Sequence, residues 1–297
     1  MLKPGYIIYT DNNAILTTNG IKSSLIAGNA SFEGSGYKNG AGSLAVFSGL
    51  RGFLQLSKKE IIVVEFGNSC LRMIGRPINM VSDITKPCPA WNGQASPFLW
   101  PNSVVKDKVS LQKLFVTERR AIRQLTLKSW EVSTFFESAQ IKKFKHLVQD
   151  RQGDVFVTAG AAVYKIGYKD KVIQLLAGAP ERSGFDSLFS DQSYQIEFIG
   201  KENLLLADWA TLRLIDLQSN KVSTLGVNVC CLNSVTSFLI TADSLFVGQY
   251  GAILRLICEF IILSFFVALA LQYWWSFAIE PRIKPLPSTS YFCHFKM

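Results

Sequence analysis

The sequence predicts an all-β body followed by one transmembrane helix. Between residues 5 and 256 the chain consists of short runs rich in Val, Ile, Leu and Phe, each ended by polar or glycine-containing turns, with no useful helical periodicity. One strand–turn–strand unit recurs along that whole stretch. An apolar run of membrane-spanning length follows it. These observations divide the chain into residues 1–256, 257–279 and 280–297.

The recurring unit is an apolar run ending in a small or acidic residue, then a short turn, then a second apolar strand. Its turn-entry positions are separated by 54, 53, 41, 49 and 41 residues, and this spacing suits one four-stranded blade per unit. We therefore expect a propeller of about six blades, because a small antiparallel sheet must stack on neighbours to bury its apolar faces. The turn-entry residues are Asp11, Glu65, Glu118, Ala159, Asp208 and Gln249.

The remainder of the unit also repeats. A further strand ends in glycine at Ser23–Gly28, Val172–Gly178 and Lys221–Gly226, and two copies continue into a glycine-rich connection that leads to Phe. Together these residues resemble the NHL repeat family of β-propellers, whose pattern is an apolar run ending in Asp, an Ile/Leu-Arg strand, a strand ending in Gly, and a Gly-rich loop leading to Phe and Pro. The resemblance covers residues 5 to 256 and implies a propeller fold. The pattern's Asp is replaced in four of the six units.

Counting strands leaves both ends of the ring short. Only Met1–Pro4 precedes the first unit, which therefore starts near its second strand, and the last unit has three strands before the membrane segment. The N-terminus also has no apolar run of signal-peptide length. We expect that the protein begins upstream, with a segment that carries both missing strands and a signal peptide.

The segment Ile257–Ile279 is predicted to cross the lipid bilayer. Its 23 residues contain one charged side chain, Glu259, and as a helix they would span about 34 Å against a hydrocarbon core of about 30 Å. Aromatic residues at 273–275 mark its far interface, and Pro281 ends it. The alternative is a buried core helix. Residues 280–297, with three prolines and no periodicity, are predicted to be disordered.

The flanking charges favour a propeller on the extracellular or lumenal side. Arg255 precedes the helix, whereas Arg282, Lys284 and Lys296 follow it, and basic residues prefer the cytoplasmic side. The alternative is tail-anchored insertion with a cytosolic propeller.

Two further features bear on the compartment. Cys70 and Cys88 could form a disulfide in an oxidising compartment. Asn29 begins a possible glycosylation triplet.

The residues give little support for catalysis. His146 is the one histidine before the membrane segment, so the propeller cannot supply the three imidazoles of the zinc centre that NHL-like amidating lyases use. No GxSxG motif is present, and the glycine-rich stretch Gly34–Gly42 fails the phosphate-loop pattern and is interpreted as a connection between blades. Gluconolactonase-like propellers hold a divalent cation with carboxylates and amides. The candidates here are Asp150, Asp154, Asp208 and Asp243, although acidic residues at strand ends commonly stabilise turns.

Basic residues recur in the second strand of the units. Arg72, Arg123 and Arg213 share one register, whereas Lys165 and Arg255 lie one position later and so face the other way. With a net charge of +9, the three arginines could form an anion-binding surface. The alternative is that they pair with Asp or Glu and cover apolar neighbours.

We predict from these features a membrane-tethered, non-enzymatic scaffold that recognises a protein or glycan through the propeller loops, since loops on a rigid repeat scaffold commonly carry recognition. This interpretation requires no cofactor or metal. The first alternative is a divalent-cation-dependent, lactonase-like hydrolase at the propeller axis. A lesser alternative is RNA or polyanion binding. Because RNA binding does not need a membrane anchor, nucleic acid is not the expected partner.

Overall fold

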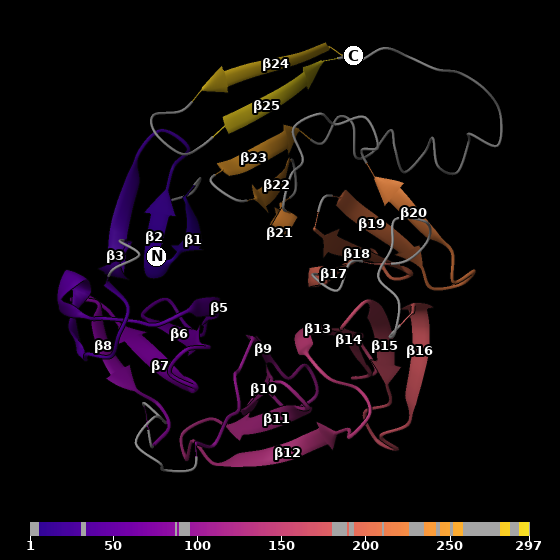
Figure 1. The fold of residues 1–297 in the computed structure, drawn as a ribbon, viewed down its shortest axis with the longest axis horizontal. Helices are drawn as coiled ribbons and strands as arrows, with labels where there is room; N and C mark the ends of the chain where they lie inside the picture. The colour runs from indigo at the N-terminus through magenta and orange to yellow at the C-terminus, as the bar shows by residue number, and fades with distance from the viewer. Residues whose placement is uncertain are drawn as a thin grey trace.

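The computed structural model shows a six-bladed β-propeller. It describes residues 6–30, 34–86, 88, 96–179, 189, 193–209, 211–225, 235–241, 244–249, 252–257, 280–285 and 291–296. In these residues six antiparallel sheets form a ring around a central axis, and the chain visits them in order (Figure 1). The predicted all-β propeller is thus confirmed.

The strands of the first three blades follow the predicted units. Blade 1 contains β1 (Ile7–Asp11), β2 (Asn13–Thr18) and β3 (Ser23–Asn29). Blade 2 contains β5 (Leu50–Gln55), β6 (Glu60–Glu65), β7 (Cys70–Gly75) and β8 (Met80–Asp83), with the short β4 (Gly40–Ala41) added beside β8. Blade 3 contains β9 (Ser103–Lys106), β10 (Lys113–Thr117), β11 (Ala121–Thr126) and β12 (Val132–Glu137).

The other three blades complete the ring. Blade 4 contains β13 (Phe144–Gln149), β14 (Val155–Ala159), β15 (Ala162–Ile166) and β16 (Ile173–Gly178). Blade 5 contains β17 (Ser193–Ile199), β18 (Asn203–Asp208), β19 (Thr211–Asp216) and β20 (Val222–Leu225). Blade 6 contains β21 (Val235–Ile240), β22 (Ser244–Gln249) and β23 (Ala252–Ile257).

Blades 1 and 6 have three strands each among the described residues, as the strand count predicted. The turn-entry residue Asp11 ends β1, so β1 corresponds to the second strand of the other blades. In blade 6, β23 has no neighbour on its outer side in the hydrogen-bonded sheet.

Residues 280–297 were predicted to be disordered, but the described part of this segment contains two strands. They are the antiparallel strands β24 (Glu280–Pro285) and β25 (Tyr291–Lys296), and β25 lies beside β23 (Figure 1). An unpaired sheet edge is a ready site for a further strand, which gives this arrangement a physical reason.

The predicted transmembrane helix lies, beyond Ile257, outside the described residues and stays a prediction. Among the helices of the described residues, none is long and apolar enough to cross a membrane.

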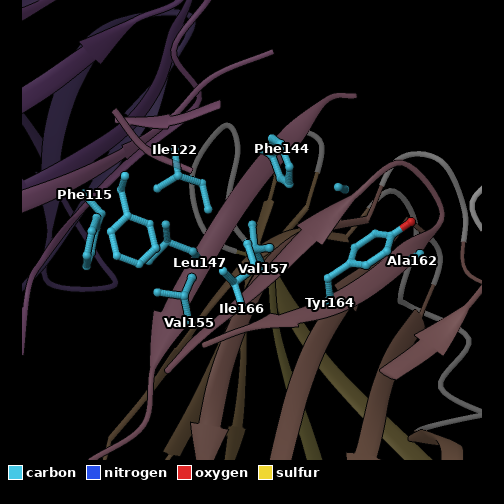
Figure 2. Close-up of a cluster of buried hydrophobic side chains, with 11 residues drawn as sticks. Phe115, Ile122, Phe144, Leu147, Val155, Val157, Ala162, Tyr164 and Ile166 are labelled. Atoms are coloured by element: carbon cyan, nitrogen blue, oxygen red, sulfur yellow. The ribbon is translucent and has the colours of Figure 1, made fainter. Parts of the chain in front are cut away.

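The core lies between the blades. Alternate residues of β6 contribute to different clusters: Ile61 and Val63 pack with blade 1, and Ile62 and Val64 pack with blade 3. The same alternation separates Val155 and Val157 from Phe156 in blade 4. Figure 2 shows one such interface, where Phe115 and Ile122 of blade 3 meet Phe144, Leu147 and other residues of blade 4. Both faces of a blade are therefore buried by its neighbours, as the apolar runs predicted.

The innermost strands of blades 2, 4, 5 and 6 share a distortion near their first residues, whereas β9 of blade 3 pairs with β10 without a register shift. The register shifts between Leu50 and Gly52 in β5, between Phe144 and Leu147 in β13, between Ser193 and Ile196 in β17, and between Val235 and Ser237 in β21. A bulge of this kind leaves an extra residue unpaired and redirects its side chain.

Glycine at the end of the outermost strand accommodates the phenylalanine that opens the next blade. Gly28 and Gly178 have φ values of +91° and +89°. A Cβ atom on Gly178 would lie 2.3 Å from the Ala161 carbonyl oxygen and 2.7 Å from the Phe189 ring, and Gly28 meets Phe47 in the same way. Phe47 and Phe189 are both fully buried. The recurring Gly and Phe of the sequence are thus one packing contact between blades.

We predict that Gly178→Ala lowers the free energy of unfolding by about 3 kcal/mol, because it adds both a strained φ and a clash with backbone. Gly200→Ala is the matched control, since Gly200 also has a positive φ, +68°, but its added Cβ would meet nothing within 4 Å. We expect the control to cost about 1 kcal/mol. Urea unfolding of both variants measures the difference, and equal losses would contradict the packing role.

Candidate functional site

The three arginines singled out in the sequence occupy equivalent places. Arg72 lies opposite Val63, Arg123 opposite Val116 and Arg213 opposite Leu206. In each blade the turn-entry carboxylate is two residues beyond that partner, so it lies on the same face of the sheet.

Each arginine forms an ion pair with this carboxylate. The nitrogen–oxygen distances are 2.8 Å for Arg72–Glu65, 2.7 Å for Arg123–Glu118 and 3.1 Å for Arg213–Asp208. The arginine side chains are 0%, 28% and 10% exposed, respectively. Each guanidinium thus holds a carboxylate, which agrees with the pairing alternative. An anion-binding surface at these three arginines stays a prediction.

The blades that lack the acid also lack the arginine. In blade 4 the two positions hold Ala159 and Tyr164, which are 2% and 5% exposed. In blade 6 they hold Gln249 and Leu254. Removing only one member of a buried ion pair leaves an uncompensated charge, so buried members are expected to be replaced together. Blade 1 keeps the acid Asp11 with Leu16 at the arginine position, but Asp11 is exposed.

The register predicted for the other basic residues is also observed. Lys165 lies opposite Phe156, one position beyond Tyr164. Its Nζ atom is 2.9 Å from a carboxylate oxygen of Asp154. In the backbone register, Arg255 lies opposite Phe246.

Arg72 and Glu65 also fix the glycine-rich connection into blade 2. Arg72 donates hydrogen bonds to the carbonyl oxygens of Val46 and Lys38, and its guanidinium lies 4.9 Å from the ring centroids of both Tyr37 and Phe47. Burial raises the pKa of Glu65, and the charge of Arg72 acts in the opposite direction. The stretch Gly34–Gly42 is therefore held as a connection between blades.

The carboxylates considered for a metal site have other partners. Asp150 accepts a hydrogen bond from the Asp154 amide at 2.9 Å, Asp154 pairs with Lys165, and Asp208 pairs with Arg213. Asp243 lies outside the described residues. Within the part of the chain that the structure describes, no group of three or more His, Cys, Asp or Glu residues could hold a metal ion.

His146 occupies the bulge of β13. Its backbone N–H donates to the Thr158 hydroxyl at 3.1 Å, and that hydroxyl donates to the His146 carbonyl at 3.2 Å. Its Nδ1 atom is buried and has no hydrogen-bond partner among the described residues. Burial lowers the pKa of His146 to about 4, although a hydrogen bond with the Ile196 backbone acts in the opposite direction. The imidazole is therefore neutral at physiological pH.

The two remaining sequence candidates concern covalent modification. Cys70 and Cys88 are joined by a disulfide, with a Cα–Cα distance of 5.6 Å. Asn29 ends β3 and is exposed, and glycosylation there stays a prediction.

The structure brings together a surface cluster that the sequence did not reveal. We call the top face the side that carries the turns between second and third strands, such as residues 66–69 and 118–120, and the bottom face the side with turns such as 56–59 and 150–154. On the top face the Arg51 guanidinium lies over the Phe66 ring at 4.6 Å, and the Arg119 guanidinium lies over Trp100 at 4.8 Å. The two rings stack with centroids 6.2 Å apart and planes 23° apart. We call Arg51, Phe66, Trp100 and Arg119 the Arg–aromatic ladder.

The ladder is exposed but firmly held. Trp100 is 40% exposed and has a φ of +53°, a value that a bulky residue adopts only when its surroundings enforce it. The Glu118 carboxylate accepts a hydrogen bond from the Leu99 amide at 2.7 Å, and Asn102 donates to the Trp100 carbonyl at 3.3 Å. Arg51 is the unpaired residue of the β5 bulge.

Neither arginine of the ladder forms an ion pair with a described carboxylate, in contrast to Arg72, Arg123 and Arg213. Two sequence features relate to the ladder: the basic pair Arg119-Arg120 and the aromatic residue of Trp100-Pro101. Nothing in the sequence showed that they meet.

Comparison with known proteins supports the fold. No protein-family model and no curated protein match the chain. A chain of a nidogen/laminin complex aligns with a TM-score of 0.61 at 9% identity, over 86% of this chain and 90% of that one. An auxiliary nutrient binding protein from Bacteroides ovatus has a TM-score of 0.61 at 12% identity, over 84% and 65%. Inactive virginiamycin B lyase from Staphylococcus aureus with quinupristin has a TM-score of 0.52 at 10% identity, over 84% and 79%. At such identities the likeness concerns the fold alone.

The paired replacement in blades 4 and 6 predicts the outcome of a double-mutant cycle in blade 5. Arg213→Leu should lower the free energy of unfolding by about 3 kcal/mol, because Asp208 stays buried without this guanidinium. Asp208→Gln with Arg213→Leu, the combination found in blade 6, should return to within about 1 kcal/mol of the parent. Denaturant titration of these two variants and of Asp208→Gln alone gives the coupling energy, and strictly additive losses would refute this view of the pair.

His146 should make stability depend on pH. Its pKa is about 4 in the folded protein and about 6.5 when unfolded, so between these values the unfolded chain binds more protons. Its contribution is complete above about pH 6.5 and is lost as the pH falls through about 4. Between pH 7.5 and 4.5 we expect the parent to lose about 2 kcal/mol more than His146→Gln does. Urea unfolding at both pH values tests this, and parallel losses would contradict it.

Proposed function

We propose that the chain is a membrane-tethered, non-enzymatic recognition protein of the NHL-like propeller type, which binds a protein or glycan through its top face. The observation that carries this proposal is the contrast between two sets of charged groups. The arginines inside the blades are paired with carboxylates, whereas those of the Arg–aromatic ladder are exposed and pair with no described carboxylate. Exposed, rigidly held Arg and Trp are the residue types that most often dominate binding energy at interfaces.

The sequence supports the anchor and the NHL-like assignment. Ile257–Ile279 has the length and apolar character of a single membrane span. It begins at Ile257, the last residue of β23, so such a span would hold the propeller close to the bilayer. The order of strand, turn, glycine and phenylalanine matches the NHL pattern in several units.

We place the propeller on the extracellular or lumenal side. The Cys70–Cys88 disulfide supports this side, since such bonds persist in oxidising compartments. The excess of basic residues after the span agrees.

The names of two proteins with a similar fold are consistent with a binding role. One is described as a nutrient binding protein and the other belongs to a nidogen/laminin complex. The lactonase-like alternative has less support, because Asp150, Asp154 and Asp208 are engaged in turns and ion pairs.

The test is binding of the full-length protein in detergent to arrays of glycans and of secreted proteins. We expect binding to at least one member, and loss of that binding in Arg51→Gln/Arg119→Gln on the top face. Lys59→Gln/Arg151→Gln is the matched control, because it removes the same charge from exposed positions of the bottom face. A γ-lactone hydrolysis assay with Ca²⁺, Mg²⁺ or Mn²⁺ should show no turnover.

Two outcomes would overturn the proposal. Cation-dependent lactone hydrolysis would establish the enzyme instead. Binding that survives the top-face substitutions would place recognition elsewhere on the molecule.

A further inference from the structure

We propose that the Arg–aromatic ladder binds a linear acidic glycan, a sugar chain that bears carboxylate or sulfate groups. This inference rests on the proposed function of the top face and narrows its partner to one chemical class.

The ladder presents guanidinium donors for which the described residues supply no side-chain hydrogen bond or ion pair. A guanidinium is planar and carries five N–H donors, so an arginine that lies over an aromatic ring can still direct donors outward. Arg51 and Arg119 lie over Phe66 and Trp100, and neither forms an ion pair with a described carboxylate. Carboxylate and sulfate groups accept such paired donors in a bidentate manner.

An arginine already lies over one face of each ring. Arg51 lies over Phe66 and Arg119 lies over Trp100, and the two rings stack on each other. Single-stranded nucleic acids bind by stacking bases on free aromatic faces. The ladder therefore suits a ligand that is read through its anionic groups, rather than one that is read by base stacking.

Positive charge continues from the ladder toward blade 4. Arg120 and Lys142 are exposed, and the Lys143 amide donates to the Arg119 carbonyl at 2.5 Å, which places this segment beside the ladder. Of the nearby carboxylates, Glu65 and Glu118 are 0% and 2% exposed and are paired with Arg72 and Arg123. The exposed Glu137 lies opposite Ala121, beside Arg120, at the far end of this row. A row of cations matches a linear polyanion better than it matches a single anion.

An oxidising compartment favours a glycan over a nucleic acid as the polyanion. The Cys70–Cys88 disulfide indicates an oxidising environment, where acidic polysaccharides rather than nucleic acids are the common polyanions.

Heparin is the probe, and the full-length protein in detergent is titrated into it at several salt concentrations. Arg51→Gln/Arg119→Gln should weaken the Kd at least about tenfold, because it removes both charged groups that would donate hydrogen bonds to the anionic groups of the glycan. The slope of log Kd against the logarithm of the salt concentration should fall by about two, because two fewer charges of the protein release counterions from the polyanion. Arg51→Lys/Arg119→Lys should keep that salt dependence but bind several-fold more weakly than the parent, because lysine lacks the planar fork.

The matched control Lys59→Gln/Arg151→Gln should change the Kd less than about twofold. An equal loss in this control would show attraction to net charge only and would overturn the ladder as the site. Tighter binding of single-stranded RNA than of heparin, lost in the same ladder variant, would replace glycan with nucleic acid. Binding of a secreted protein through the top face without any heparin binding would overturn the glycan inference and leave the proposed function standing. Absence of any top-face binding would overturn both.

Discussion

The carboxylate that ends the second strand of a blade connects three parts of that blade. In blade 3, Glu118 binds the Arg123 guanidinium on the third strand and the Leu99 amide in the segment that enters the blade. In blade 2, Glu65 binds Arg72 and the Ser48 amide in the same way. Trp100 follows Leu99 in the entering segment of blade 3, and Arg51 follows Ser48 near the start of β5, so the ion pairs position the exposed ladder. A buried pair adds little net stability compared with apolar side chains, but it fixes geometry because neither member can be left alone.

Much of the fold could be predicted because the propeller is repetitive. Side chains along a strand point alternately to its two faces. A continuous apolar run therefore indicates a sheet that is buried on both faces. The recurring turn-entry positions then give the blade count, and the offset of one residue between Arg213 and Lys165 gives their opposite faces. These features depend only on local spacing, so the sequence contains them directly.

The candidate site could not be predicted in the same way. Arg51, Phe66, Trp100 and Arg119 come from separate segments of two blades, and their contact depends on two local irregularities. One is the bulge that redirects Arg51, and the other is the positive φ of Trp100. Neither an arginine nor a tryptophan in the sequence indicates that its backbone adopts such a conformation. The sequence also could not show that Arg72 is fully buried, because an arginine in a strand commonly extends to solvent.

The unequal distribution of ion pairs also bears on how the ring assembles. A chain of similar units can pair a strand with the wrong blade, which is a characteristic failure of repeat proteins. If β19 paired with β14 in the same register, Arg213 would be buried beside Ala159, with no carboxylate to meet it. If β15 paired with β18, the Asp208 carboxylate would face Tyr164. The ion pair thus distinguishes the hairpins of blades 2, 3 and 5 from those of blades 4 and 6, and the cost of an unpaired charge disfavours exchange between the two groups.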